Sequence, residues 1–166
     1  MKALFLSLLL IAGAPAYAAG PNEITSENVI RLMNDYRAQQ GLPPLASEKR
    51  LAMAAEDRMR HMEEEGYWAH TAPDGLTPFF WVKHRDYEFR AVGENLATGF
   101  ETARVLVEAW MESPGHRANI MSSLYEDCGI AIIDGSTVGP ATGKAIVVLF
   151  GVQQDTGRKF ARATRR

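Results

Sequence analysis

The hydrophobic pattern of this chain changes its period once, near Gly129, and this change limits the fold more than any other feature. Before it, apolar residues recur at helical spacing; after it, two β-branched runs without helix formers follow, at 130–134 and 145–152. The stretch between the runs is rich in Gly, Ser, Thr and Pro, which favours a hairpin. Helices therefore precede strands without β-α-β alternation, and this order predicts an α+β domain with an antiparallel sheet and helices packed on it.

Three long helices are expected before the change of period. The first is capped by Thr25 or Ser26 and ends before Gly41, the second is capped by Ser47 and ends at Gly66, and the third covers 101–111. A short fourth helix is expected from Thr77-Pro78 to about residue 84. Their apolar faces hold the candidate core: Val29, Ile30, Met33, Tyr36, Leu51, Ala54, Ala55, Met59, Met62, Ala103, Leu106, Val107 and Trp110.

The N-terminus has the layout of a secretory signal peptide. Lys2 supplies a positive charge, residues 3–12 form a short apolar run, and Ala16-Tyr17-Ala18 offers an A-x-A cleavage site. The run is well short of the roughly 20 residues that a membrane-spanning helix needs. We therefore expect residues 1–18 to be removed and the protein to be exported, to a periplasm or to the medium. No later stretch is apolar enough to cross a membrane.

Charge is distributed unevenly along the chain. The net charge is −2, yet the last nine residues, 158–166, carry five Lys or Arg and no acid. The body of the protein is therefore acidic, which argues against nucleic acid as a partner. We expect 154–166 to be a disordered basic tail, with contact to an anionic surface as the alternative. Cys128 is the only cysteine, so an internal disulfide is excluded, and its apolar surroundings favour a buried, inert thiol.

Three polar residues stand in irregular, turn-rich sequence and not on a periodic face. They are His70 in Trp68-Ala69-His70, Glu94 in an extended or irregular segment between Gly93 and Asn95, and His116 after Ser113-Pro114-Gly115, where a short helical turn is expected to start. Loops held by a rigid scaffold are where functional residues collect. The other two histidines, His61 on a helix and His84 between basic residues, are expected at the surface.

The order of short motifs along the chain resembles one family. These motifs are Asn34-x-x-Arg37, Gly41-Leu42-x-x-Leu45, Gly93-Glu94-Asn95-Leu96-Ala97, the run 110–120 (WMESPGHRANI), Gly129-Ile130 and Phe150-Gly151. In this order they resemble the CAP superfamily of cysteine-rich secretory, antigen 5 and pathogenesis-related 1 proteins, in its short, cysteine-poor bacterial branch. The resemblance covers about 28–153, with 19–27 as a lead-in. It implies an α-β-α sandwich in which helices flank a small antiparallel sheet.

The resemblance also implies a central cleft with two histidines and two acids, which in several members binds a divalent metal, commonly zinc. Carried over by motif, His70, Glu94 and His116 match three of these residues. The fourth position is Ser113 here, so Glu112 is the nearest candidate for the second acid. Two imidazoles and a carboxylate suit Zn²⁺, with water in an open position. A metal-free hydrogen-bonded network of the same residues is the alternative.

Besides the possibility of a purely structural envelope protein, two functions remain open at this point. One is a binding module for a lipid, peptide or protein ligand, resting on the cleft or on the aromatic residues Trp68, Phe79, Phe80 and Trp81, which otherwise belong to the core. The other is a hydrolase that acts on peptide or cell-envelope material with metal-activated water. The sequence shows no Ser or Cys nucleophile paired with a base, which disfavours covalent catalysis. One fold hosts many functions, so binding is preferred and catalysis is left undecided.

Overall fold

The computed structural model describes residues 20–154. The signal peptide expected at 1–18, and the basic tail from residue 155 on, lie outside the described residues. The elements follow one another in chain order: α1 (Ser26–Gln39), β1 (Ala46–Ser47), α2 (Lys49–Glu65), α3 (Pro78–His84), β2 (Phe89–Thr98), α4 (Ala103–Glu112), α5 (Pro114–Ile120), β3 (Asp127–Ser136) and β4 (Gly143–Gln153).

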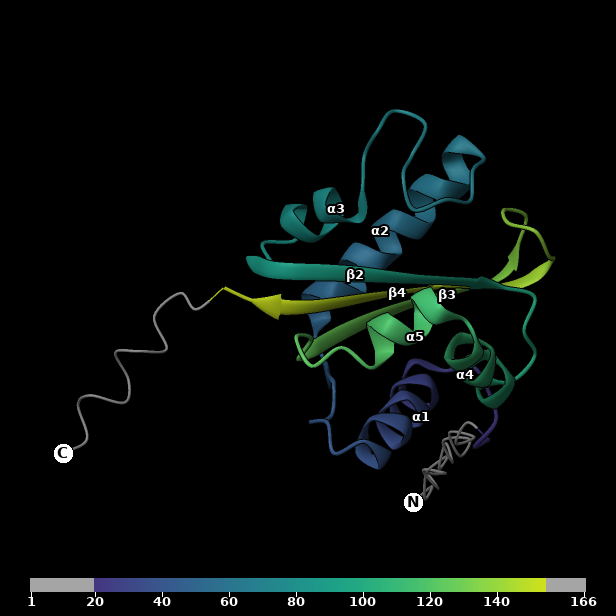
Figure 1. Ribbon diagram of the computed structural model, residues 1–166. Coiled ribbons are helices and arrows are strands. Elements are labelled where there is room, and N and C mark those ends of the chain that lie inside the picture. The colour runs from purple at the N-terminus through teal and green to yellow at the C-terminus, as the bar shows by residue number, and fades with distance from the viewer. Residues whose placement is uncertain (1–19, 155–166) are drawn as a thin grey trace, which may run out of the picture.

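Helices cover both faces of a single four-stranded sheet (Figure 1). In Figure 1, α2 and α3 lie above the sheet, and α1, α4 and α5 lie below it. The expected α+β fold, an α-β-α sandwich, is confirmed. Because a sheet buried on both faces needs apolar residues at every position, β3 and β4 read as continuous apolar runs without alternation.

Successive residues of the central strands feed two separate cores. Ile130 and Ile132 of β3 face the core of α1, α4 and α5, whereas Ala131 and Ile133 face the core of α2 and α3. Cys128 lies in the first of these cores with none of its surface exposed, as expected. Burying each large side chain contributes roughly 1.5–3 kcal/mol, and with no disulfide these two cores carry the fold.

The strands lie in the order β1-β3-β4-β2. The β3–β4 hairpin is antiparallel, as the sequence predicts, and β2 pairs antiparallel with the other side of β4. The two-residue β1 pairs parallel to the start of β3. β1 was not expected, and for the segment around Glu94 the sequence left an extended and an irregular conformation open. β2 carries polar residues at an edge and β1 is too short to show a period, so neither gives a clear strand pattern.

The helix boundaries agree closely with the sequence, with one exception. Thr25 caps α1, accepting a hydrogen bond from Asn28 N, and Pro78 begins α3. The expected cap Ser47 of the second helix is wrong: Ser47 belongs to β1, and the Glu48 side chain caps α2 by accepting from Arg50 N. Parallel pairing with β3 shifts the helix start by one residue. Among residues 20–154 no helix combines the length and apolarity needed to cross a bilayer.

Candidate functional site

Glu94 is a buried acid on the edge strand β2. It lies on β2 opposite Leu149 of β4, and only 7% of its surface is exposed. Both oxygens of its carboxylate are engaged: Oε1 accepts from Arg58 Nε at 3.1 Å, and Oε2 accepts from His70 Nδ1 at 2.7 Å. A buried carboxylate without such partners would be costly, and Arg58 and His70 supply one hydrogen bond to each of its oxygens.

Arg58 connects this acid to the segment that carries His70. It lies on α2 with none of its surface exposed, and its guanidinium stacks on Trp81 at 4.5 Å from the ring centroid. The same guanidinium donates to the Tyr67 hydroxyl and to the Ala69 carbonyl. Arg58 therefore fixes both the acid and the backbone immediately before His70.

His70 stands in the irregular segment after α2, with 60% of its side chain exposed. Its Nδ1 donates to Glu94, so Nε2 lies on the opposite edge of the ring, away from the buried acid. The hydrogen bond to Glu94 raises the pKa of His70, against the opposing effects of burial and of the Arg58 charge. A carboxylate that orients an imidazole in this way is the usual arrangement behind a histidine that binds a metal or a ligand.

His116 is brought to the same region by α5. The Asn95 side chain donates to the His116 carbonyl at 3.2 Å, and Asn119 donates to the Glu94 carbonyl at 3.0 Å and to Asn95 Oδ1 at 2.8 Å. Gly93 permits this approach, since a Cβ there would lie 2.7 Å from Asn119 Oδ1. Burial first, and then the charge of His70, lower the pKa of His116, so the two imidazoles lie close enough to influence each other.

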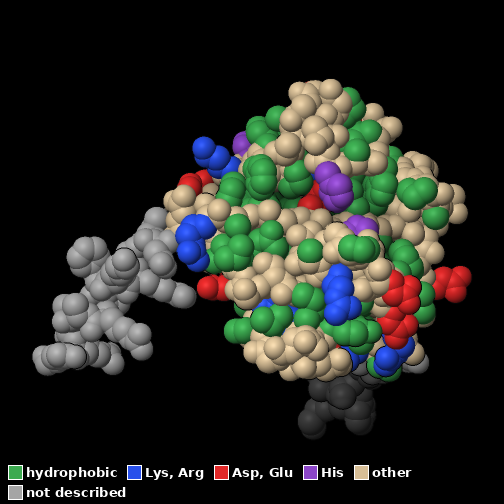
Figure 2. Space-filling model, in the orientation of Figure 1, with side chains coloured by type: hydrophobic (Ala, Val, Ile, Leu, Met, Phe, Trp, Pro, Cys, Tyr) green, Lys and Arg blue, Asp and Glu red, His purple; other side chains and the backbone are tan. Residues whose placement is uncertain are grey.

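A groove opens beside His116. It has a volume of about 320 Å³ and is mostly apolar. Its walls come from the segment before His70, the end of β2, helix α4 and the turn before β4; they are Trp68, Leu96, Ala97, Thr98, Phe100, Ala109, Trp110, Ser113, His116 and Pro140. Figure 2 shows histidine side chains close together in the middle of one face, beside a partly hidden acidic side chain.

The donor set fits a divalent metal only in part. Among residues 20–154, no three His, Cys, Asp or Glu side chains form a group that could hold a metal ion. Glu94 has given one oxygen to a guanidinium and the other to an imidazole, so it is placed to orient His70 and not to ligate. The two imidazoles, His70 and His116, are the side chains whose chemistry suits Zn²⁺. Metal binding stays a prediction.

The structure does not bring Glu112 to the other three residues. Glu112 is exposed at the C-terminal end of α4, and no hydrogen bond or ion pair within residues 20–154 joins it to His70, Glu94 or His116. Its inclusion in the site stays a prediction without support from the geometry. Of the three residues expected in loops, only His70 lies in an irregular segment. Glu94 is on β2, and His116 is on α5, which begins where the short helical turn was expected.

The remaining histidines and aromatic residues divide between core and surface. His84 is exposed, as expected, but His61 is not simply a surface residue: it is half-buried, its Nδ1 lies 2.8 Å from the Tyr67 hydroxyl and its ring contacts Trp81. Trp81 is buried, whereas Phe79 and Phe80 are about half exposed. Of the four aromatic residues proposed as a ligand surface, only Trp68 lines the groove.

Sequence reasoning did not find Arg58, the residue that completes the site. It stands on the buried face of an amphipathic helix, between Ala55 and Met62, where the pattern calls for an apolar residue. An arginine on such a face indicates a buried ion pair, because a buried cation needs an anion.

The fold and the sequence motifs are those of one protein class. The model of the cysteine-rich secretory protein family, CAP, matches residues 30–149, and the chain belongs to this family, in its bacterial branch. A Bacillus subtilis relative, the uncharacterized protein YkwD, is 31% identical over 134 residues, which cover 75% of this chain and 52% of YkwD. The membrane protein YlbC of the same organism is 27% identical over 111 residues, 66% of this chain and 32% of YlbC. The chain thus spans at most about half the length of these relatives.

Solved structures share the fold at lower identity. An extracellular protein of Bacillus anthracis that contains an SCP domain superposes with a TM-score of 0.67 at 23% identity, over 76% of this chain and 40% of that one. An outer surface protein of Borrelia burgdorferi superposes with a TM-score of 0.66 at 24% identity, over 80% of this chain and 98% of that one. The latter shows that this fold also occurs as nearly the whole of a chain.

Proposed function

We propose that this chain is an exported ligand-binding module, whose ligand is a small amphipathic molecule held in the groove beside His116. The observation that carries the proposal is the groove itself: a mostly apolar trough that ends at a partly buried imidazole. Pockets for small ligands combine apolar walls with a few placed polar groups. Trp68, Leu96 and Trp110 suit the apolar body of such a molecule, while Ser113 and His116 suit its polar end.

Export is supported by two independent features. The first is the sequence of residues 1–18, with its charged start, apolar run and A-x-A end. The second is the similarity to solved structures, since one similar structure is an extracellular protein and another is an outer surface protein.

A matched pair of variants tests the groove. Dodecanoate serves as the probe in calorimetric titration of the purified protein. Ala109→Phe adds a ring to the wall of the groove, whereas Ala118→Phe adds the same ring to the exposed face of α5. We expect saturable binding that falls about tenfold or more in Ala109→Phe and stays unchanged in Ala118→Phe, a difference of about 1.4 kcal/mol. Equal affinities in the two variants, or no saturable binding by the unaltered protein, would show that the groove does not take such ligands.

A divalent cation at the polar end of the groove is the finer part of the proposal. His70 and His116 would hold Zn²⁺, and Glu94 and Arg58 keep the His70 ring in place. Bound zinc supplies a Lewis acid at that end. Calorimetric titration with Zn²⁺ alone should show binding near 1:1 that is lost in His70→Ala/His116→Ala and kept in His84→Ala, because His84 is exposed elsewhere. Retention of zinc by the double variant would place the metal elsewhere.

The zinc titration, followed by an assay of peptide hydrolysis, tests the alternative function, that of a hydrolase. A hydrolase acting on peptide or cell-envelope material would need a bound cation to activate water. Cys128, the only thiol, is buried in the core, away from any substrate. If zinc binds at His70 and His116, loss of peptide hydrolysis in folded His116→Ala would establish the hydrolase; absence of hydrolysis in the zinc-loaded protein leaves binding as the function.

A further inference from the structure

The outer edge of β3 is left open over most of its length. β1 consists of two residues and pairs only with Asp127 and Cys128, after which the chain turns away into α2. β3 continues to Ser136, with β4 on its other side. The sheet order β1-β3-β4-β2 places this edge two strands away from β2, which carries Glu94. The edge of β3 is therefore separate from Glu94 and from the groove beside His116.

The direction of the backbone groups on this edge follows from the pairing with β1. Glu48 N donates to the Cys128 carbonyl at 2.8 Å, so Cys128 faces β1. Alternate residues of a strand face the same side, so the N–H and C=O groups of Ile130 and Ile132 point out of the same edge, beyond the end of β1. Within residues 20–154, no hydrogen bond reaches these groups from that side. Such groups form a template for another strand.

A groove runs along this edge. Residues 130–133 form its floor, Glu56, Arg60 and Glu63 of α2 form one wall, and Ser26 marks the start of α1; the volume is about 570 Å³. Ser26 also lines a second groove, of about 690 Å³, which follows α1 toward Ser47. The two grooves share Ser26, and we call them together the β3-edge groove. The strand segment 130–133 on its floor matches about four residues of extended chain, at roughly 3.3 Å each.

The α2 wall of the β3-edge groove carries uncompensated negative charge. Arg60 is paired with Asp57 of its own helix, at 3.2 Å. Within residues 20–154, no ion pair neutralises Glu56 or Glu63. The wall therefore sets two acids, which form no ion pair among these residues, against one cation, Arg60, and its charge is net negative.

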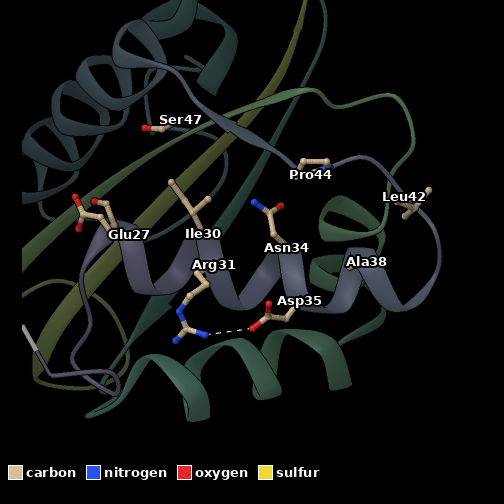
Figure 3. A pocket seen from close by; sticks show the side chains of 10 residues that line it. Glu27, Ile30, Arg31, Asn34, Asp35, Ala38, Leu42, Pro44 and Ser47 are labelled. Carbon is tan, nitrogen blue, oxygen red and sulfur yellow. Dashed lines mark hydrogen bonds and ion pairs between the residues drawn. The ribbon is translucent and has the colours of Figure 1, made fainter.

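On the α1 wall, too, a cation is paired with an acid of its own helix, and another acid forms no ion pair among the described residues. Figure 3 shows the side chains of Ile30 and Asn34 extending from α1 on the side of Ser47, while Arg31 and Asp35, which also line the groove, extend from the other side of the helix and pair with each other, at 3.2 Å. Glu27, one turn before Arg31, has no ion pair within the part of the chain that the structure describes. An occupant with positive charges therefore meets Glu56 and Glu63 on the α2 side, and Glu27 beside the apolar Ile30 on the α1 side.

We propose that the β3-edge groove binds an extended segment of a partner polypeptide that carries basic side chains. Such a segment adds a strand to the sheet: its backbone pairs with Ile130 and Ile132, and its basic side chains meet Glu56 and Glu63. In strand addition the main-chain bonds supply affinity and the side chains that alternate along the strand supply specificity. An acidic segment would face like charges and is rejected.

Fluorescence anisotropy with a labelled eight-residue peptide of alternating valine and lysine tests the charge. The variant is Glu56→Lys/Glu63→Lys, and the control is Glu64→Lys/Glu65→Lys, which makes the same change of net charge on the same helix outside the groove. We expect the groove variant to lose about tenfold or more in affinity and the control to lose less than about threefold. Equal losses in the two variants, or equal binding of a peptide of alternating valine and glutamate, would overturn the proposal.

Amide hydrogen exchange tests the strand addition itself. The saturating lysine peptide should slow exchange at Ile130 and Ile132, whose N–H groups face the open edge. Exchange at Ala131 and Ile133 should change little, since these residues face β4 and are already paired. Protection absent from Ile130 and Ile132, or protection that appears without peptide as the protein concentration rises, would refute the proposal; the second result would show that a second copy of the chain occupies the edge.

Discussion

At the scale of single residues, the most consequential pair is Arg58 and Glu94, both buried and each dependent on the other. Arg58→Met should destabilise the protein by about 3–5 kcal/mol, because it leaves a carboxylate in the core without its cation. Glu94→Gln alone should also lower the free energy of unfolding. The double variant Arg58→Met/Glu94→Gln should lose much less than the sum of the losses in the two single variants. Urea unfolding of the four proteins measures the coupling.

The exposed pair Arg31–Asp35 provides the control for that experiment. Half or more of each side chain is exposed, so Arg31→Met should change the free energy of unfolding by less than about 0.5 kcal/mol. Additive losses for Arg58→Met and Glu94→Gln would mean that the ion pair does not hold the site together, and that the position of His70 depends on other contacts.

Cys128 offers a second test at this scale. Its thiol is fully buried, and burial raises its pKa to about 12. Since the thiolate is the reactive form, the folded protein should not react with a disulfide reagent at pH of about 8 over hours, and should react at once when unfolded in urea. Rapid reaction without denaturant would show that the core around β3 opens readily.

Residue patterns predict some of these features and not others. The motifs predict His70, Glu94 and His116; the structure brings Glu94 into contact with His70, and Asn95, next to Glu94, donates to the His116 carbonyl. The hydrogen bonds that bring these residues together could not be predicted from the sequence, because Arg58 is 36 residues from Glu94 along the chain. Partners so distant are brought together only by the packing of α2 on the sheet.

At the scale of elements, the long helices and the β3–β4 hairpin could be predicted because each carries a clear period. β1 and β2 could not: β1 has two residues, and β2 mixes Arg90, Glu94 and Asn95 with apolar residues because it is an edge strand beside the cleft. Pairing with β4 and bonds from α5 make β2 a strand, and these contacts come from other parts of the chain.

The packing of α2 on β3 depends on the absence of one side chain. A Cβ at Gly129 would lie 2.0 Å from Ala52 N and 2.2 Å from the Leu51 carbonyl carbon, so the first turn of α2 rests directly on the strand. Gly129→Ala should therefore cost about 3 kcal/mol or more, since backbone must move. Thermal or urea unfolding measures the loss.

Gly115→Ala is the matched control for Gly129→Ala. Gly115 lies in α5, and a Cβ there would meet nothing within 4 Å. The change should alter the free energy of unfolding by less than about 1 kcal/mol, because alanine is the better helix former. If Gly129→Ala were equally mild, the contact between α2 and β3 would be looser than the structure has it.

At the scale of the whole molecule, charged links between elements make the stability of the protein depend on pH. Asp57 of α2 accepts from Arg85, just after α3, at 2.6 and 2.7 Å, and also pairs with Arg60. The hydrogen bonds from Arg85 hold the pKa of Asp57 below its ordinary value, against the opposing effect of burial. Asp57 therefore binds its proton less readily in the folded protein than in the unfolded one.

The sign of the resulting pH dependence follows directly. A depressed pKa in the folded state stabilises the protein above the pKa of the unfolded state, and this stabilisation is lost as the pH falls through the folded pKa. Asp57→Asn should thus lower the free energy of unfolding by about 1 kcal/mol at pH of about 7. The difference from the unaltered protein should shrink as the pH falls below about 4, where the aspartate of the unfolded chain becomes protonated.

Urea unfolding at a series of pH values, with Asp35→Asn as the control, measures this effect. Asp35 belongs to an exposed pair, so its variant should follow the unaltered protein at every pH. A gap for Asp57→Asn that stays constant down to the lowest pH would mean that the carboxylate is not ionised in the pair, and that α3 is held on α2 by Trp81 and Val82 alone. A gap that closes on acidification assigns Asp57 and Arg85 as the link between these helices, on the layer that also holds Arg58.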